Sequence, residues 1–198
     1  MKALKVFGIV LGLIVVVILV MIAMQSPQSH VERSITINAS PSAVFPYFND
    51  FKKFNEWSPW VKLDPNIQQT YEGPPAGVDS KMSWTSEKLG PGSQWIIESE
   101  ENKRVKTGLQ FGGFDGRFFS EAVMDPIEKG TRVTYHYYGD VSNTGFVNVM
   151  MGKFFGMFMD SMLGKDYEKG LNNLKDVVEQ QPQISPDANA ATDSTGVK

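Results

Sequence analysis

Residues 31–48 read VERSITINASPSAVFPYF, and within this one segment the pattern changes from that of a strand to that of a helix. Apolar and polar residues alternate from Val31 to Asn38, which is typical of a half-buried strand. Ser40 is a favoured N-cap and Pro41 a favoured first helical residue. The apolar residues that follow give a short helix one buried face. The segment therefore predicts a strand that leads directly into a helix.

The chain beyond this point continues with a second short helix and then a series of strands. The second helix is predicted over residues 50–56. Strands bounded by Gly, Pro, Asn or Asp are predicted at residues 67–72, 81–86, 94–101, 103–111, 117–124 and 132–141. Their spacing of about ten residues favours antiparallel neighbours. From Phe155 to Val178 apolar residues recur every three or four positions, which predicts a long helix of about 30 residues that covers the sheet.

The start of the chain is an unbroken apolar run from Val6 to Met24, preceded by Lys2 and Lys5. As a helix it is about 28 Å long, close to the thickness of a bilayer's hydrocarbon core. We predict a single transmembrane signal anchor over residues 1–24, with both lysines on the cytoplasmic side. The rest of the chain then lies outside the inner membrane, in the periplasm if the source is a Gram-negative bacterium.

Three other interpretations of this run are less favoured. A cleaved signal peptide has a shorter apolar region and an Ala-x-Ala pattern before its cleavage site. A lipoprotein needs a cysteine, and the chain has none. A buried core helix rarely contains so long a run of β-branched residues.

The remaining sequence divides into a linker, one domain and a tail. Residues 25–30 form a short polar linker, and residues 31–180 provide about 150 residues, which is enough for one hydrophobic core. The tail at 181–198 is polar and aperiodic and is predicted to be disordered. The formal net charge is -3 and no basic block is present, so nucleic-acid binding has little support. The absence of cysteine excludes disulfides, thiol catalysis and cysteine-based metal sites.

The predicted element order resembles the helix-grip fold of the START and Bet v 1 (SRPBCC) superfamily, and specifically its bacterial polyketide cyclase/dehydrase-like members. The resemblance covers about residues 31–180. It is carried by ASPSAVF (39–45), FNEWSPW (54–60), GTRVTY (130–135) and LGKDYEKGL (163–171). It implies an α+β fold in which a curved antiparallel sheet of about seven strands is closed by the C-terminal helix. It says little about activity, because this fold hosts lipid carriers, hormone binders, cyclases and chaperone regulators.

The resemblance also implies a cavity between the sheet and the long helix. Alternation along the strands, together with the first turns of the last helix, predicts the residues that line it. They are Trp84, Trp95, Phe118, Ser120, Ala122, Tyr135, Tyr137, Phe155, Met159 and Met162. Methionine and aromatic side chains suit an irregular apolar ligand, and the small Ser120 and Ala122 leave room. The alternative is that these side chains simply fill the core.

The segment from Phe146 to Leu163 contains more large apolar residues than one face of a helix can bury. Some of them must face solvent, a ligand entrance, a protein partner or lipid. Gly145, Gly152 and Gly156 weaken a helix here, which is compatible with a mobile lid over a cavity mouth. The alternative is a second short helix packed normally in the core.

No catalytic group, metal site or cofactor is predicted. His30 lies in the linker, and alternation places His136 on the strand face opposite its neighbouring tyrosines, toward water. Two isolated histidines without cysteine disfavour a zinc site. No Gly-x-Ser-x-Gly motif supports a serine nucleophile. The strand carboxylates, Glu98 and Glu100 among them, fall on the outer face, where charge is the default.

Three functions stay open. We predict a membrane-anchored domain that binds a lipid or other hydrophobic small molecule between its sheet and its C-terminal helix. The first alternative is a non-catalytic scaffold or regulatory module with a filled core, which contacts a protein partner through residues 146–163. The second is a polyketide cyclase- or dehydratase-like enzyme, for which Ser120, Tyr135 and Tyr137 are the only candidate polar groups in the cavity.

Overall fold

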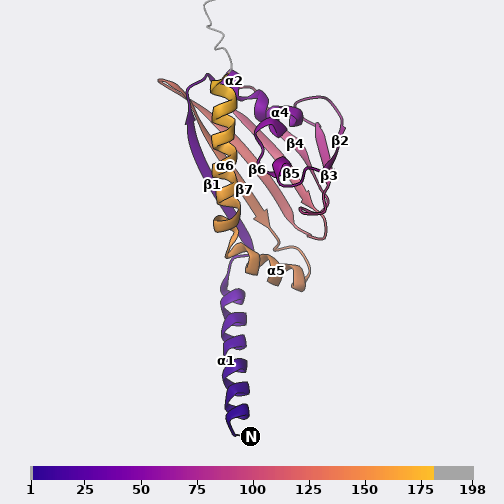
Figure 1. The fold of residues 1–198 in the computed structure, drawn as a ribbon, viewed down its shortest axis with the longest axis vertical. Coiled ribbons are helices and arrows are strands. Elements are labelled where there is room, and N and C mark those ends of the chain that lie inside the picture. Colours follow the sequence, from indigo (N-terminus) through magenta and orange to yellow (C-terminus); the bar gives the residue numbers. More distant parts are fainter. Residues whose placement is uncertain (1, 181–198) are drawn as a thin grey trace, which may run out of the picture.

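The computed structural model describes residues 2–180, and the tail predicted to be disordered, 181–198, lies outside them. Figure 1 shows a curved sheet crossed by one long helix, with an N-terminal helix projecting from one end. The antiparallel strands lie in the order β1-β7-β6-β5-β4-β3-β2. Their bounds are β1 Gln28–Ile37, β2 Gln68–Glu72, β3 Lys81–Thr85, β4 Gly92–Glu100, β5 Arg104–Phe111, β6 Arg117–Ile127 and β7 Gly130–Asp140. The architecture confirms the predicted α+β helix-grip fold.

The helices differ from the prediction in two places. Their bounds are α1 Lys2–Met24, α2 Pro41–Val44, α3 Pro46–Asn49, α4 Phe51–Trp57, α5 Phe146–Gly156 and α6 Met159–Glu179, with a 3-10 turn at Trp60–Lys62. The first short helix is divided because Pro46 has no N–H to continue it and instead starts α3. The predicted long helix is two helices, α5 and α6, separated by Met157 and Phe158.

Two strands are longer than the sequence predicts. Strand β1 begins at Gln28, which pairs with Asp140, so the last residues of the predicted linker belong to the sheet. Strand β6 runs through Pro126 to Ile127, where a turn is predicted. Pro126 is tolerated because the pairing of β6 with β5 has already ended at Val123, so its missing N–H leaves no neighbour unpaired on that side.

Polar contacts fix α6 along β1. The guanidinium of Arg33 donates to Asp160 at 2.8 Å and to Glu168 at 2.7 Å, one helical turn to either side of Gly164. A side chain at Gly164 would collide with that guanidinium, so the glycine gives it room. Near the other end of α6, Lys175 donates to the carbonyl of Thr36 at 2.9 Å. The covering helix is therefore held at both ends.

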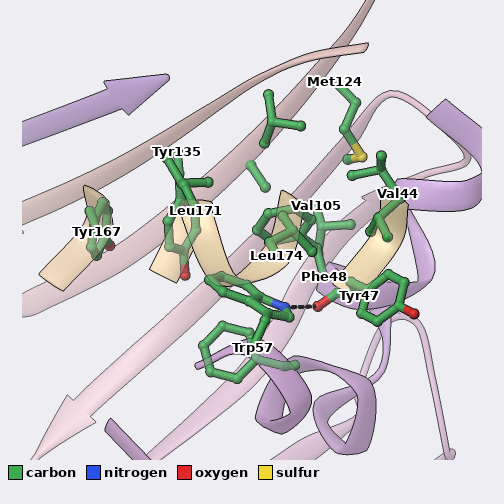
Figure 2. Packing of buried hydrophobic residues seen from close by; sticks show 14 of the residues in the cluster. Val44, Tyr47, Phe48, Trp57, Val105, Met124, Tyr135, Tyr167, Leu171 and Leu174 are labelled. Atoms are coloured by element: carbon green, nitrogen blue, oxygen red, sulfur yellow. Dashed lines mark hydrogen bonds between the residues drawn. The ribbon is translucent and has the colours of Figure 1, made fainter. Parts of the chain in front are cut away.

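The packed part of the core includes α2, α3, α4 and the C-terminal half of α6. These elements lie at the end of the sheet remote from α1 (Figure 1). Figure 2 shows Tyr47, Phe48 and Trp57 from the short helices against the C-terminal half of α6. The Trp57 indole N–H donates to the carbonyl of Tyr47 at 3.0 Å and so satisfies a buried donor. Leu174 of α6 is fully buried there.

Helix α1 stands clear of this domain (Figure 1). It is apolar and long enough to cross a membrane, and almost none of its surface is buried by the rest of the chain. Both a membrane anchor and a signal sequence have these properties. Its last turn is met by Lys153 of α5, whose ammonium donates to the carbonyl of Ala23 at 2.7 Å.

Candidate functional site: a cavity beneath α5 and α6

A cavity of about 400 Å³ lies between the inner face of the sheet and helices α4, α5 and α6. This volume falls within the range of about 300–1,000 Å³ that is usual for small-molecule sites. The packed core fills the space under the C-terminal half of α6. The cavity instead reaches Pro27, Gly139 and Val141, at the start of β1 and the end of β7, and these strand ends lie beside α1. The cavity therefore occupies the half of the domain nearer to α1.

Eight of the predicted residues line this cavity: Trp84, Phe118, Ser120, Tyr135, Tyr137, Phe155, Met159 and Met162. They come from β3, β6, β7, α5 and the start of α6. The structure thus brings together side chains that were predicted from the alternation along the strands and side chains that were predicted from the spacing along the helix. Their part in ligand binding stays a prediction.

Trp95 is the clear correction, because it lies on the outer face of the sheet. A β-bulge between Ile96 and Glu98 changes the phase of the alternation within β4. Beyond the bulge Glu98 faces outward as predicted, but before it Gln94 and Ile96 point inward and Trp95 points outward. There Trp95 covers Gly108, whose missing side chain makes room for the indole.

Ala122 faces inward but does not reach the cavity. It pairs with Tyr135 on β7 and with Val105 on β5 and is fully buried in the packed core. Along β6 the boundary between cavity and core therefore falls between Ser120 and Ala122. The small side chain at residue 122 serves close packing and leaves no free space.

The sequence reasoning missed the contribution of α4 and of the residues that follow it. Phe54, Asn55, Ser58 and Trp60 all line the cavity. Ser58 is 1% exposed, and its hydroxyl is the one buried side-chain polar atom without a hydrogen-bond partner among residues 2–180. The apolar spacing of this helix indicates an inward face, but no sequence signal places that face at the cavity instead of in the core.

The polar groups inside the cavity are mostly neutral hydroxyls and amides. The Tyr135 hydroxyl donates to Ser120 at 3.3 Å, and the Tyr135 ring stacks on Tyr167 with centroids 4.4 Å apart. Burial raises the pKa of Tyr137 to about 12 and also raises the pKa values of Tyr135 and Tyr167. At neutral pH these phenols are protonated and can orient a polar group, but they cannot act as bases. Asp115 is the one carboxylate among the described lining residues.

Helix α5 closes the cavity toward α1 and carries no buried residue. Gly152 lets it approach the sheet, because a side chain there would meet Val141 at 2.6 Å. The excess of apolar residues predicted for this segment reaches the surface, where Phe146 is 79% exposed. Phe155 and Met162 both line the cavity and reach solvent, so they mark its opening.

The two histidines are not isolated, which corrects the sequence interpretation. His136 faces outward as predicted, but His30 belongs to β1 and lies beside it, with a ring nitrogen 3.3 Å from a ring nitrogen of His136. The pair lies on the outer face of the sheet and has no contact with the cavity.

The chain is similar to known proteins both in its sequence pattern and in its fold. A family model described as "Polyketide cyclase / dehydrase and lipid transport" matches residues 28–179. A solved structure from Thermobifida fusca superposes with a TM-score of 0.57 at 16% identity, over 78% of this chain and 95% of that one. A structure from Chromobacterium violaceum gives 0.52 at 16% identity, over 77% and 99% of the two chains.

The structure of Ara h 8.0201 gives a TM-score of 0.51 at 10% identity, over 78% of this chain and 99% of that one. At such low identities these likenesses show a shared fold alone. The comparison with curated proteins gives no match.

Proposed function

We propose that this chain, which belongs to the polyketide cyclase, dehydrase and lipid transport family, is a membrane-anchored protein that binds a lipid or another apolar small molecule. The observation that carries the proposal is the cavity of about 400 Å³, whose walls are mainly aliphatic and aromatic side chains. A well-packed domain leaves few voids larger than a water molecule, so a space of this size is best explained by a guest.

The ligand we propose has one polar group on an apolar body. Ser58 lines the cavity, and its hydroxyl is buried without a partner, which costs about 1–3 kcal/mol. A rotation of the Ser58 side chain toward the cavity would let a hydroxyl, carbonyl or carboxyl group of a ligand pair with it. The Tyr135 hydroxyl, which donates to Ser120, and the Tyr137 hydroxyl, which is hydrogen-bonded to Ser29, can each still accept a hydrogen bond from the ligand. Phe118 and Met159 provide apolar contacts.

The proposed source of the ligand is the membrane itself. We propose that α1 is an uncleaved single-pass anchor in the inner membrane and that the domain lies on the extracytoplasmic side. Helix α5 sits beside the end of α1 (Figure 1). It exposes Phe146, Val147 and Phe154. These side chains would then meet the lipid surface, and the opening at Phe155 and Met162 would face the phase in which apolar ligands reside.

A protein partner is the second candidate for the exposed face of α5. An apolar patch of this kind marks a contact surface whatever covers it. A scaffold or regulatory role would use the same side chains but would not need the cavity. The two functions therefore differ in whether the cavity holds a ligand. The experiment must measure ligand bound to the purified protein.

The test is native mass spectrometry of the full-length protein, released from detergent micelles after purification from cells. We expect a co-purifying adduct with the mass of a lipid or similar amphiphile. Ser120→Leu fills part of the cavity and should remove most of that adduct. Ser83→Leu is the matched control, because Ser83 lies on the outer face of the sheet, and it should leave the adduct unchanged. An adduct-free mass, together with no uptake of a fluorescent fatty acid, would reject the proposal.

A further inference from the structure

We infer that His30, Glu32 and His136 form a binding site for a borderline divalent cation of the Zn²⁺ type on the outer face of the sheet. The inference is independent of the cavity, which lies on the other face. It starts from the pairing of β1 with β7, in which Glu32 is opposite His136 and His30 is opposite Tyr138. Because alternate residues of a strand share one face, all four side chains stand together on the outer side.

The distances between the candidate ligand atoms match the edges of a tetrahedral site. His30 Nε2 lies 3.3 Å from His136 Nδ1, and His136 Nδ1 lies 3.3 Å from the Glu32 carboxylate. Bonds from Zn²⁺ to nitrogen are about 2.0–2.1 Å long, so two ligands of a tetrahedral ion lie about 3.3–3.4 Å apart. The three ligand atoms all lie within 4.8 Å of one another, and a small rotation of the exposed Glu32 closes the third edge.

In this geometry the three groups together present more lone pairs than there are protons or cationic side chains in the described part of the chain to pair with them. His136 Nδ1 faces an imidazole nitrogen and a carboxylate oxygen at once, and a single proton can serve both contacts only by being shared between them. Among residues 2–180, Glu32 forms no ion pair with a lysine or an arginine. A metal ion would instead take one lone pair from each of the three groups.

Aromatic stacking holds the rings in place before any ion arrives. The His30 ring stacks on Tyr138 with centroids 4.6 Å apart, and Tyr138 stacks in turn on Phe119 at 4.7 Å. The side chain of His136 is only 16% exposed, whereas that of Glu32 is 53% exposed. The site is thus fixed on one side and open to solvent on the other, where water can take the fourth position.

The ligand set selects the class of ion. Two imidazoles and one carboxylate suit Zn²⁺, Cu²⁺ or Ni²⁺, while Mg²⁺ and Ca²⁺ prefer oxygen ligands alone. The ion would tie the first residues of β1 to β7 close to the point where the chain leaves α1. We therefore assign it a role in bracing the junction between the apolar helix and the sheet.

The experiment uses full-length protein in detergent micelles, purified with a tag free of histidine and treated with EDTA. Calorimetric titration with ZnCl₂ should show one site per chain. His30→Ala and His136→Ala should each weaken the affinity at least about tenfold, and Glu32→Gln should weaken it measurably. The control is Glu56→Gln on α4, which should leave the affinity unchanged. Wild-type protein that takes up no zinc, or variants that bind it equally well, would overturn the inference.

A spectroscopic measurement covers the case in which a variant fails to fold. The chain contains only 2 histidines, so the ring nitrogens of wild-type protein give two resolvable sets of ¹⁵N signals. Zinc should move the signals of His30 Nε2 and His136 Nδ1 together and leave their other ring nitrogens protonated. Coordination through one ring only, or through the opposite nitrogens, would show that the ion binds elsewhere.

Discussion

At the scale of single residues, the polar character of the cavity comes from a few hydroxyl groups among its apolar side chains. Tyr137 is 5% exposed and points inward from β7, and burial disfavours its phenolate form. Tyr135 and Ser120 form a hydrogen-bonded pair beside it, while the buried Ser58 hydroxyl has no partner. A ligand toward which the Ser58 side chain rotates would satisfy this hydroxyl.

Burial of Tyr137 predicts a loss of stability at alkaline pH. Its pKa is about 12 in the folded protein and about 10 when unfolded, so below pH 10 both states are protonated and stability does not change. Between these values the unfolded state alone releases the Tyr137 proton, and this residue lowers the free energy of unfolding by about 2–3 kcal/mol. The buried Tyr135 and Tyr167 add to the fall, because their pKa values are also raised. Urea unfolding followed by tryptophan fluorescence from pH 9 to 12 measures this fall.

Two variants separate this effect from general alkaline damage. Tyr137→Phe should reduce the fall by most of this residue's contribution of about 2–3 kcal/mol, because no phenol remains at residue 137 to ionise. Tyr71→Phe is the comparison: burial raises the pKa of Tyr71 as well, but Tyr71 is 43% exposed, so most of the fall should remain. Equal pH profiles for all three proteins would show that Tyr137 does not control the loss.

At the scale of elements, the division of the C-terminal segment into α5 and α6 makes the cavity accessible. A single straight helix would present one face to the sheet along its whole length. The break at Met157 and Phe158 instead lets α5 turn across the end of the sheet, with Gly152 against Val141 (Figure 1). The break leaves the apolar side chains of α5 facing outward and its inner residues over the cavity.

The position of α5 predicts that its exposed face lies within the membrane surface. The chain has no cysteine, so Phe146→Cys gives a single attachment site for a nitroxide spin label. In lipid nanodiscs we expect this label to be accessible to oxygen and shielded from a water-soluble nickel reagent, because the helix sits at the boundary of the acyl chains. Power-saturation electron paramagnetic resonance measures both accessibilities.

The control for this measurement is a label at the opposite end of the domain. Glu101→Cys, in the turn between β4 and β5, should be fully accessible to the nickel reagent. A label at residue 146 that is just as accessible would place α5 in water. The exposed face would then be left for a protein partner.

Most of the fold could be predicted from the sequence, because strand alternation and helical spacing are local patterns. The same local rules placed eight of the ten expected side chains at the cavity. They failed at Trp95 because a single bulged residue in β4 reverses the alternation, and nothing in the sequence marks the position of that bulge. They failed for Ser58 and for the pairing of His30 with His136 because those positions depend on tertiary packing and on strand register.

At the scale of the whole molecule, the buried core and the cavity lie at different ends of the long axis. The end remote from α1 is packed by Trp57, Leu171 and Leu174, while the end beside α1 contains the cavity and the exposed α5 (Figures 1 and 2). Regions with few buried contacts open at lower free energy than the core does. The end at which we propose that a ligand enters is therefore also the end at which local opening is least costly.

The proposed function places the cavity end of the domain at the membrane surface, with α1 still attached and the domain outside the cytoplasm. The two charges before the apolar run, Lys2 and Lys5, favour retention of the N-terminus in the cytoplasm. Alkaline phosphatase fused to the C-terminus in a Gram-negative host should therefore be active, and green fluorescent protein exported at the same position should be dark. The intact mass of the membrane-extracted protein should still include residues 1–24.

Charge reversal at Lys2 and Lys5 tests the physical cause of this orientation. With both changed to Glu, the positive-inside bias is removed, so phosphatase activity per molecule should fall and fluorescence should rise. Substitution of both by Arg keeps the charge and should leave the two reporters unchanged. A bright wild-type fluorescent fusion would put the cavity and α5 on the cytoplasmic side. A mature mass without residues 1–24 would make α1 a signal sequence and leave α5 as the domain's remaining candidate for membrane contact.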